Sequence, residues 1–159
     1  MISATFTGQI ITGFEEKLAL LPILTAYIPM LMDTGGNSGS QASVTVIRGI
    51  SLGEVEFTDI FKVIWKEMRV ALLCGMTLAG CNFVKLLFFD KLTVIVALTI
   101  CLTLIVTIFC AKCVGCTLPL FAFKFGFDPA VMASPFITTI VDAISLLVYF
   151  QFATHLLGL

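Results

Sequence analysis

The amino-acid sequence predicts an all-α integral membrane protein, and three observations support that prediction. Of its 159 residues, 59% are hydrophobic and 12% are charged, whereas a soluble domain has about 25% charged residues. The mean hydropathy is +1.11, which leaves too little polar surface to cover a soluble globule. Because a span takes about 20 residues, the chain has room for about five or six spans. We therefore expect residues 1–159 to form a single transmembrane domain without a soluble regulatory domain.

The charge balance excludes nucleic acid as a partner. Nine Lys and Arg residues stand against ten Asp and Glu residues, giving a net charge of −1. No basic run is present to neutralise a phosphate backbone. The partner that the composition predicts is membrane lipid, and we expect a multi-pass protein of the plasma membrane, the inner membrane of a bacterium or archaeon.

The first apolar segment is too short to cross a bilayer. Residues 2–13 number 12, about 18 Å of helix against a hydrocarbon core of about 30 Å. They are predicted to be half a span, either a re-entrant segment or, as we favour, the remainder of a truncated first helix. After a polar turn at residues 15–17, a helix is expected from Leu18 across the small polar residues 33–43 to about Ile50.

The second half of the chain is predicted to hold three further spans. Apolar residues at helical spacing indicate an amphipathic helix at the water interface before the first of them. Asp128 as a capping carboxylate and Pro129 as the first helical residue mark the start of the last span. The elements expected in order are an interfacial helix, a span, a very apolar span, a loop and a last span: residues 57–69, 70–89, 92–116, 117–127 and 129–157.

The distribution of basic residues predicts the orientation, because basic loop residues stay on the cytoplasmic side. Six are expected on one side of the membrane: Arg48, Lys62, Lys66, Arg69, Lys112 and Lys124. Three are expected on the other side: Lys17, Lys85 and Lys91. The first group is predicted to be cytoplasmic, with the C-terminus outside.

The last helix carries a carboxylate at its centre. Asp142 is the fourteenth of its 29 residues, and a carboxylate at that depth costs about 2.5 to 3.5 kcal/mol on insertion scales. Such residues usually face a cavity and mark an ion or proton path. Polar residues at spacings of three and four share this helical face: Ser134, Thr138, Ser145 and Tyr149. The stripe predicts a pore wall, and the alternative is a protonated Asp142 that hydrogen-bonds a neighbouring helix for packing.

The second helix carries a polar face of its own, formed by Asp33, Asn37, Gln41 and Arg48, with Gly35, Gly36 and Gly39 beside it. Asn37 lies about 16 Å along the helix from Arg48, and Asp142 about 20 Å from Pro129. The two polar faces are therefore expected at one depth, building one central site, unless the glycines serve helix packing alone. Asp33 is expected either to attract cations at the outer mouth or to cap the polar break.

The donors at this depth are oxygen atoms and amides, which indicate a hard cation. Magnesium keeps several of its waters, so a site with one carboxylate and small polar groups suits it, whereas calcium would need more carboxylates. If two copies met about an axis along this face, two Asp142 carboxylates would balance the 2+ charge.

Two segments resemble the MgtE family of magnesium channels. Residues 29–55, PMLMDTGGNSGSQASVTVIRGISLGEV, follow that family's pattern P-x-L-x-x-T-G-G-N-x-G-x-Q with a later arginine. Residues 125–150, FGFDPAVMASPFITTIVDAISLLVYF, are similar to its last helix, with D-P-A and T-x-x-D elements.

The resemblance implies a homodimer with five spans per subunit and an ion path lined by the second and fifth. It implies that Asp142 is the central ligand of the transported Mg²⁺ and that Thr138 offers its backbone or hydroxyl. Together with the polar stripes, it assigns the path lining to Gly35, Gly36, Asn37, Gln41, Ser134 and Ser145. The family usually carries a cytoplasmic magnesium-sensing portion before the first span, a regulatory partner that we expect to be missing from this chain.

Other functions stay open at this point. An exchanger that uses Asp142 as a proton or sodium site would share the same residues, and a structural subunit would not need them. The sequence Gly36 to Gly39 fits the G-x-S-G motif of rhomboid intramembrane proteases, with His155 as the base. We do not expect an enzyme, because Ser38 is predicted about 30 Å inward of the outer face, near which His155 lies.

Three cysteines form a C-x-x-C-x-x-C pattern at Cys110, Cys113 and Cys116. In a soluble protein this spacing would suggest a metal site. No fourth ligand follows nearby, and within an apolar helix cysteine behaves as a small hydrophobic residue. We expect these cysteines to pack.

Overall fold

The computed structural model describes residues 2–14 and 22–158, except for the side chains of residues 2–4 and 132–134. All regular secondary structure in these residues is helical, which confirms the predicted class. The turn expected at residues 15–17 lies outside the described residues. The elements in order are α1 (Ile2–Gly13), η1 (Pro22–Tyr27), α3 (Ile28–Ser51), η2 (Phe57–Asp59), α4 (Ile60–Phe88), α5 (Val94–Lys124) and α6 (Pro129–Leu157).

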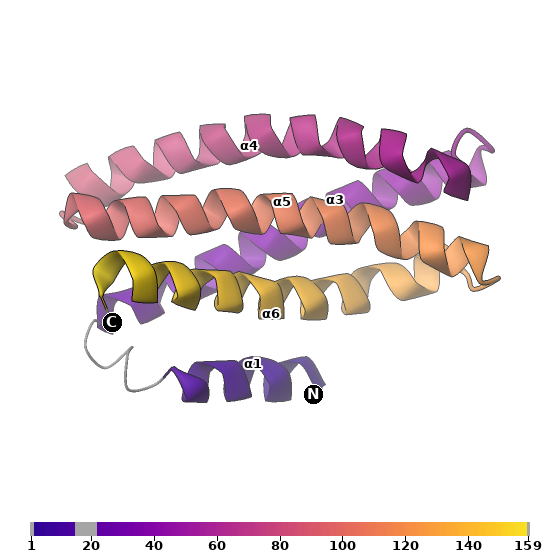
Figure 1. Cartoon of the computed structure of the whole chain (residues 1–159). Coiled ribbons are helices and arrows are strands. Elements are labelled where there is room, and N and C mark those ends of the chain that lie inside the picture. The colour runs from indigo at the N-terminus through magenta and orange to yellow at the C-terminus, as the bar shows by residue number, and fades with distance from the viewer. Residues whose placement is uncertain (1, 15–21, 159) are drawn as a thin grey trace.

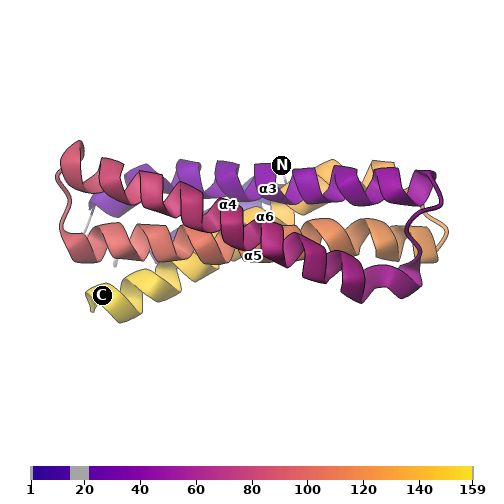
Figure 2. The same ribbon diagram turned by 90° about the horizontal axis from the view of Figure 1, so that it is seen from above.

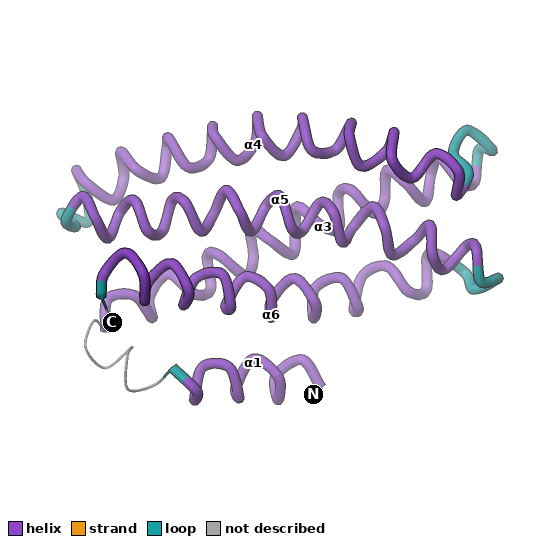
Figure 3. The backbone as a smooth tube through the Cα atoms, viewed as in Figure 1, coloured by secondary structure: helices purple, strands orange, loops and turns teal. Residues whose placement is uncertain are grey.

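Helix α5 lies at the centre of the bundle. It packs against α3, α4 and α6, while α3 also packs on α6 and α1 lies against α6. Figure 1 shows α3 crossing behind α5 on a diagonal, and Figure 2 shows α4 passing obliquely over α5. The loops that join α3 to α4, α4 to α5 and α5 to α6 lie at the two ends of the bundle (Figure 3). Because neighbours cover α5 on several sides, its sequence is apolar all round.

Within the described residues, three helical segments are long and apolar enough to cross a membrane: Phe57–Phe88, Val94–Lys124 and Pro135–Leu157. Large apolar side chains of α4 face outward, among them Leu73, Met76 and Phe88. Helix α3 has 24 residues, about 36 Å, but its polar residues lower its hydropathy. The outward apolar surface is what a bilayer would cover.

Helix α3 begins later than the sequence predicted. The chain forms the short 3₁₀ helix η1 up to Tyr27, and α3 starts at Ile28 instead of Leu18. It then continues without a break through the polar residues 33–43, as expected. Gly35, Gly36 and Gly39 are all buried there. Packing against α5 and α6 thus compensates for the weak helix propensity of glycine.

Helix α4 joins what the sequence divided into an interfacial helix and a span. It runs without interruption for 29 residues, about 43 Å. Its buried residues recur mostly every fourth position and form the face toward α5: Glu67, Ala71, Gly75, Ala79 and Leu86. This single face spans both predicted segments, so one continuous helix buries it best.

Helix α5 extends beyond its predicted end, and the loop expected at residues 117–127 is wrong over most of its length. The helix passes through Pro119, which is buried, and ends at Lys124. Membrane helices tolerate an internal proline where neighbouring groups pack around it. The stop is at Gly126, whose φ of +77° suits glycine. Phe127 N there donates to Ala122 O at 2.9 Å, closing the helix end.

The charge count that predicts the orientation needs one correction. Lys112 is a buried residue of α5, within the span predicted at residues 92–116, and does not belong to a loop. The cytoplasmic side of the bundle stays a prediction. The start of α6 is confirmed: Asp128 Oδ1 accepts a hydrogen bond of 2.9 Å from Ala130 N, and Pro129 is the first helical residue.

Candidate functional site

A groove of about 400 Å³ lies between α3 and α6 and opens to the surface of the chain. Helix α3 contributes Met32, Asp33, Gly36, Asn37 and Ser40, and α6 contributes Thr138 and Asp142. The structure thus places the carboxylate of the last helix and the amide of the second helix in one groove. We refer to it as the α3–α6 groove.

At Gly36 the two helices leave room for a small side chain. A Cβ built on Gly36 would lie 3.5 Å from Thr138 Cγ2, which is ordinary contact. A larger side chain would therefore extend into the groove. One turn further along α3, a Cβ on Gly39 would lie 2.8 Å from Ile137 Cγ2, so α3 and α6 are already in close contact there.

The Asp142 carboxylate is half-buried and lies one turn after Thr138 on α6. Among the described residues, no group donates a hydrogen bond to this carboxylate and no basic residue pairs with it. The packing alternative required a hydrogen bond to a neighbouring helix. Within the described chain Asp142 is instead available to water or to a cation.

Asp33 and Asn37 form the rim of the groove on α3. Asn37 Nδ2 donates a hydrogen bond of 3.1 Å to Asp33 Oδ2, one helical turn away. This bond orients both side chains along the exposed edge of α3. The same two residues also line a second groove on the other flank of α3, so they form the edge between the two.

Gly35 and Ser145 lie in packing contacts away from the α3–α6 groove. A Cβ on Gly35 would be 2.8 Å from both Thr107 Cγ2 and Val141 Cγ1. Ser145 is 1% exposed, and its hydroxyl donates to Val141 O at 2.6 Å. Three residues after Asp142, its side chain points about 60° away around the helix.

The remaining residues of the two stripes are dispersed. Tyr149 is buried, and its hydroxyl donates to Leu24 O at 2.9 Å, which ties α6 to η1. Gln41 lines the second groove and not the α3–α6 groove. Ser134 belongs to α6, but its side chain lies outside the described residues.

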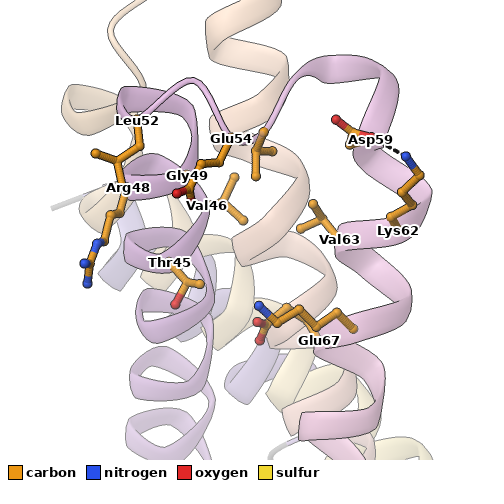
Figure 4. Close-up of a pocket in the computed structure, with 12 residues that line it drawn as sticks. Thr45, Val46, Arg48, Gly49, Leu52, Glu54, Asp59, Lys62, Val63 and Glu67 are labelled. Atoms are coloured by element: carbon orange, nitrogen blue, oxygen red, sulfur yellow. Dashed lines mark hydrogen bonds and ion pairs between the residues drawn. The ribbon is translucent and has the colours of Figure 1, made fainter.

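The second groove, of about 540 Å³, lies between α3 and α4. We refer to it as the α3–α4 groove. Its α3 side is polar, and α5 contributes Lys112. A further cavity of about 560 Å³ follows at the end where α3 leads into α4 (Figure 4). There Lys62 pairs with Asp59 at 2.8 Å, and Arg48 is among the lining residues.

The sequence reasoning missed a buried ion pair between α4 and α5. Lys112 Nζ lies 3.0 Å from Glu67 Oε2, and the two side chains are 4% and 8% exposed. One signal was available, because Lys112 interrupts a long apolar run. The partner on another helix could not be read from that run.

The described residues form neither a serine protease site nor a cysteine metal site. Ser38 lines the α3–α4 groove, whereas His155 is exposed near the end of α6, across α5 from α4. Serine and base are therefore not in one site. In the described part of the chain, no three His, Cys, Asp or Glu residues gather to hold a metal ion, and the cysteines of the C-x-x-C-x-x-C pattern are part of the packed α5.

Comparisons with known proteins cover the whole of this region. A family model described as MgtE, divalent cation transporter, matches residues 28–152, from the start of α3 into the last turns of α6. The magnesium transporter MgtE of Thermus thermophilus is 34% identical over 157 residues, 99% of this chain and 34% of that protein. The Bacillus subtilis protein of that name is 32% identical over 151 residues, 93% of this chain and 33% of its own length.

A third relative, magnesium transporter MgtE of Enterococcus faecalis, is 27% identical over 148 residues, 93% of this chain and 32% of that protein. The chain thus spans about a third of the length of the curated relatives that it matches. The apolar helices and these relatives agree with a multi-pass protein of the membrane. Since the family model covers most of the chain and includes both lining helices, the chain belongs to the MgtE family of divalent cation transporters.

Proposed function

We propose that this chain forms the ion-conducting part of a magnesium channel, in which Mg²⁺ moves along the α3–α6 groove. The observation that supports this most is the Asp142 carboxylate, which shares the groove with Asn37 and has no hydrogen-bond or ionic partner in the described chain. A carboxylate at mid-helix is costly in a bilayer unless it serves an ion. The relatives named magnesium transporters support the choice of ion.

The dimensions of the groove suit a hydrated ion. The groove, of about 400 Å³ and open to the surface, has room for an ion together with water around it. Mg²⁺ dehydrates reluctantly and is commonly held through its waters. In this proposal the Asp142 carboxylate and the side-chain oxygen of Asn37 accept hydrogen bonds from that water shell, Thr138 extends the same surface, and Asp33 concentrates cations at the outer mouth.

A second copy of the chain completes the path in this proposal. The groove opens to the surface, and one chain supplies one mid-helix carboxylate from α6. A two-fold axis along the groove would bring the partner's carboxylate to the ion and balance the 2+ charge. Each subunit then contributes a five-helix transmembrane bundle, with α1 as its first helix.

Recording from purified protein in planar bilayers tests the proposal. Unitary openings carried by Mg²⁺, and lost in Asp142→Asn, are the expected result. Magnesium flux without unitary openings, driven by a proton or sodium gradient, would instead indicate the exchanger. Flux of neither kind would remove magnesium transport from this chain.

A further inference from the structure

The Glu67–Lys112 pair is the most deeply buried charge in the described chain, and the proposed path does not use it. Its two side chains are 4% and 8% exposed, and Nζ and Oε2 are 3.0 Å apart. Taking two charges from water is expensive, and well-packed apolar residues would often serve packing better. Holding α4 against α5 therefore does not by itself explain this pair.

Lys112 lies close to the proposed path, on the opposite flank of α3. It lines the α3–α4 groove together with Asp33 and Asn37, and these two residues also line the α3–α6 groove. The depths match as well: α3 and α5 end on the same side of the bundle, and Asn37 and Lys112 lie about 21 Å and about 18 Å from those ends. About one helix diameter, 10–12 Å, separates the ammonium group from the α3–α6 groove.

We infer that Glu67 is the counter-ion that cancels the charge of Lys112 beside the ion path, so that cations passing Asp142 meet no opposing field. The inference rests on the proposed function. Protein, and not bulk water, lies between Lys112 and the groove. Charges in protein interact over such distances because the effective dielectric is lower than that of water. Without its counter-ion, the ammonium group would repel passing cations. At an effective dielectric of about 20, this repulsion would lower the rate of passage about tenfold for a monovalent ion and about a hundredfold for a divalent ion.

Two single variants distinguish the electrostatic role of Glu67 from a structural role, because only the electrostatic role predicts unequal effects on magnesium flux. Glu67→Gln leaves the lysine charge uncancelled, whereas Lys112→Met removes it. Magnesium flux into proteoliposomes is measured per folded molecule, with folding followed by size-exclusion chromatography and thermal unfolding. We expect a loss of about a hundredfold in Glu67→Gln, flux at or above the parent in Lys112→Met, and near-parental flux in the double variant Glu67→Gln/Lys112→Met.

Two further measurements sharpen the result. Sodium current in divalent-free solution should fall only about tenfold in Glu67→Gln, because the field acts in proportion to ionic charge. Glu54→Gln, which removes an exposed carboxylate from the neighbouring cavity, should leave flux unchanged.

Equal losses in the two single variants, or parental flux in Glu67→Gln, would overturn the inference while leaving magnesium transport intact. If Glu67→Gln fails to fold, Lys112→Met decides, because flux per folded molecule well below the parent contradicts a field effect. If the parent carries no magnesium, the proposed function fails and this inference fails with it.

Discussion

Asn37 donates a hydrogen bond to Asp33 one turn earlier on α3, with Nδ2 and Oδ2 3.1 Å apart. The two residues border both grooves of the bundle, the one that holds Asp142 and the one that holds Lys112. One edge of a single helix thus lies between the carboxylate of the proposed path and the only lysine found buried in the described chain.

Asp142→Asn should reduce magnesium transport at least tenfold, because the amide keeps the size of the side chain and loses the charge that balances the ion. The protein should still insert and assemble. Uptake by cells that depend on this protein measures the effect, with Gln151→Ala, an exposed site on the same helix, as the control. Undiminished uptake at normal expression would remove Asp142 from the mechanism.

Gly36 and Gly35 should respond differently to added side chains. Gly36→Leu should fold and lose most magnesium flux, because a Cβ there meets only Thr138 Cγ2 at 3.5 Å and the rest of the side chain enters the groove. Gly35→Ala should instead lower stability by about 1–3 kcal/mol, because its Cβ would lie 2.8 Å from Thr107 Cγ2 and Val141 Cγ1.

Thermal unfolding and flux, measured together, separate the two glycines. Gly80→Ala is the matched control, since a Cβ there meets nothing within 4 Å. A Gly36→Leu protein that conducts as well as the parent would show that α3 does not line the path.

Cobalt hexaammine should block magnesium flux if the site binds Mg²⁺ through its water shell. The complex has the octahedral shape of hydrated magnesium, and its ligands do not exchange, whereas a dehydrating site would need direct oxygen contacts at about 2.1 Å. Flux is measured over increasing concentrations of the complex in the parent, in Asp142→Asn and in Asp33→Asn. Block that persists equally in Asp142→Asn would place the complex elsewhere, and its loss in Asp33→Asn alone would place it at the mouth.

The end of the bundle that holds Asp90 should show two pH limits of stability. Hydrogen bonds from Lys85 and Tyr27 hold the pKa of Asp90 below its usual range. Its contribution is therefore complete above the ordinary pKa of about 3.9 and is lost as the pH falls through the lower folded value. Burial, aided by Asp90, raises the pKa of Tyr27 to about 12. The contribution of the Tyr27 hydroxyl to stability is therefore lost as the pH rises through about 12.

Thermal unfolding in detergent across the pH range measures both limits. Asp90→Asn should flatten the acid side and Tyr27→Phe the alkaline side, each with a lower midpoint at neutral pH. If the parent and Asp90→Asn lose stability in parallel between pH 5 and pH 2, the cluster does not act as described.

Composition and local signals determined the class of the protein and the start of the last helix. The apolar excess requires a lipid-facing surface whatever the helix order. The Asp128–Pro129 start acts within one turn, so α6 begins where it was expected. The end of α5 was predicted at about Cys116, whereas the helix continues through Pro119 to Lys124, just before the turn at Gly126.

Only the tertiary structure decided which polar residues share a groove. Helical spacing places Thr138, Asp142 and Ser145 on one side of α6, yet the groove holds Asp142 and Thr138 while Ser145 packs inside. Spacing defines a face around a helix's own axis, and the neighbouring helices decide how much of that face is covered. The Glu67–Lys112 pair joins residues 45 positions apart, so no local pattern could predict it.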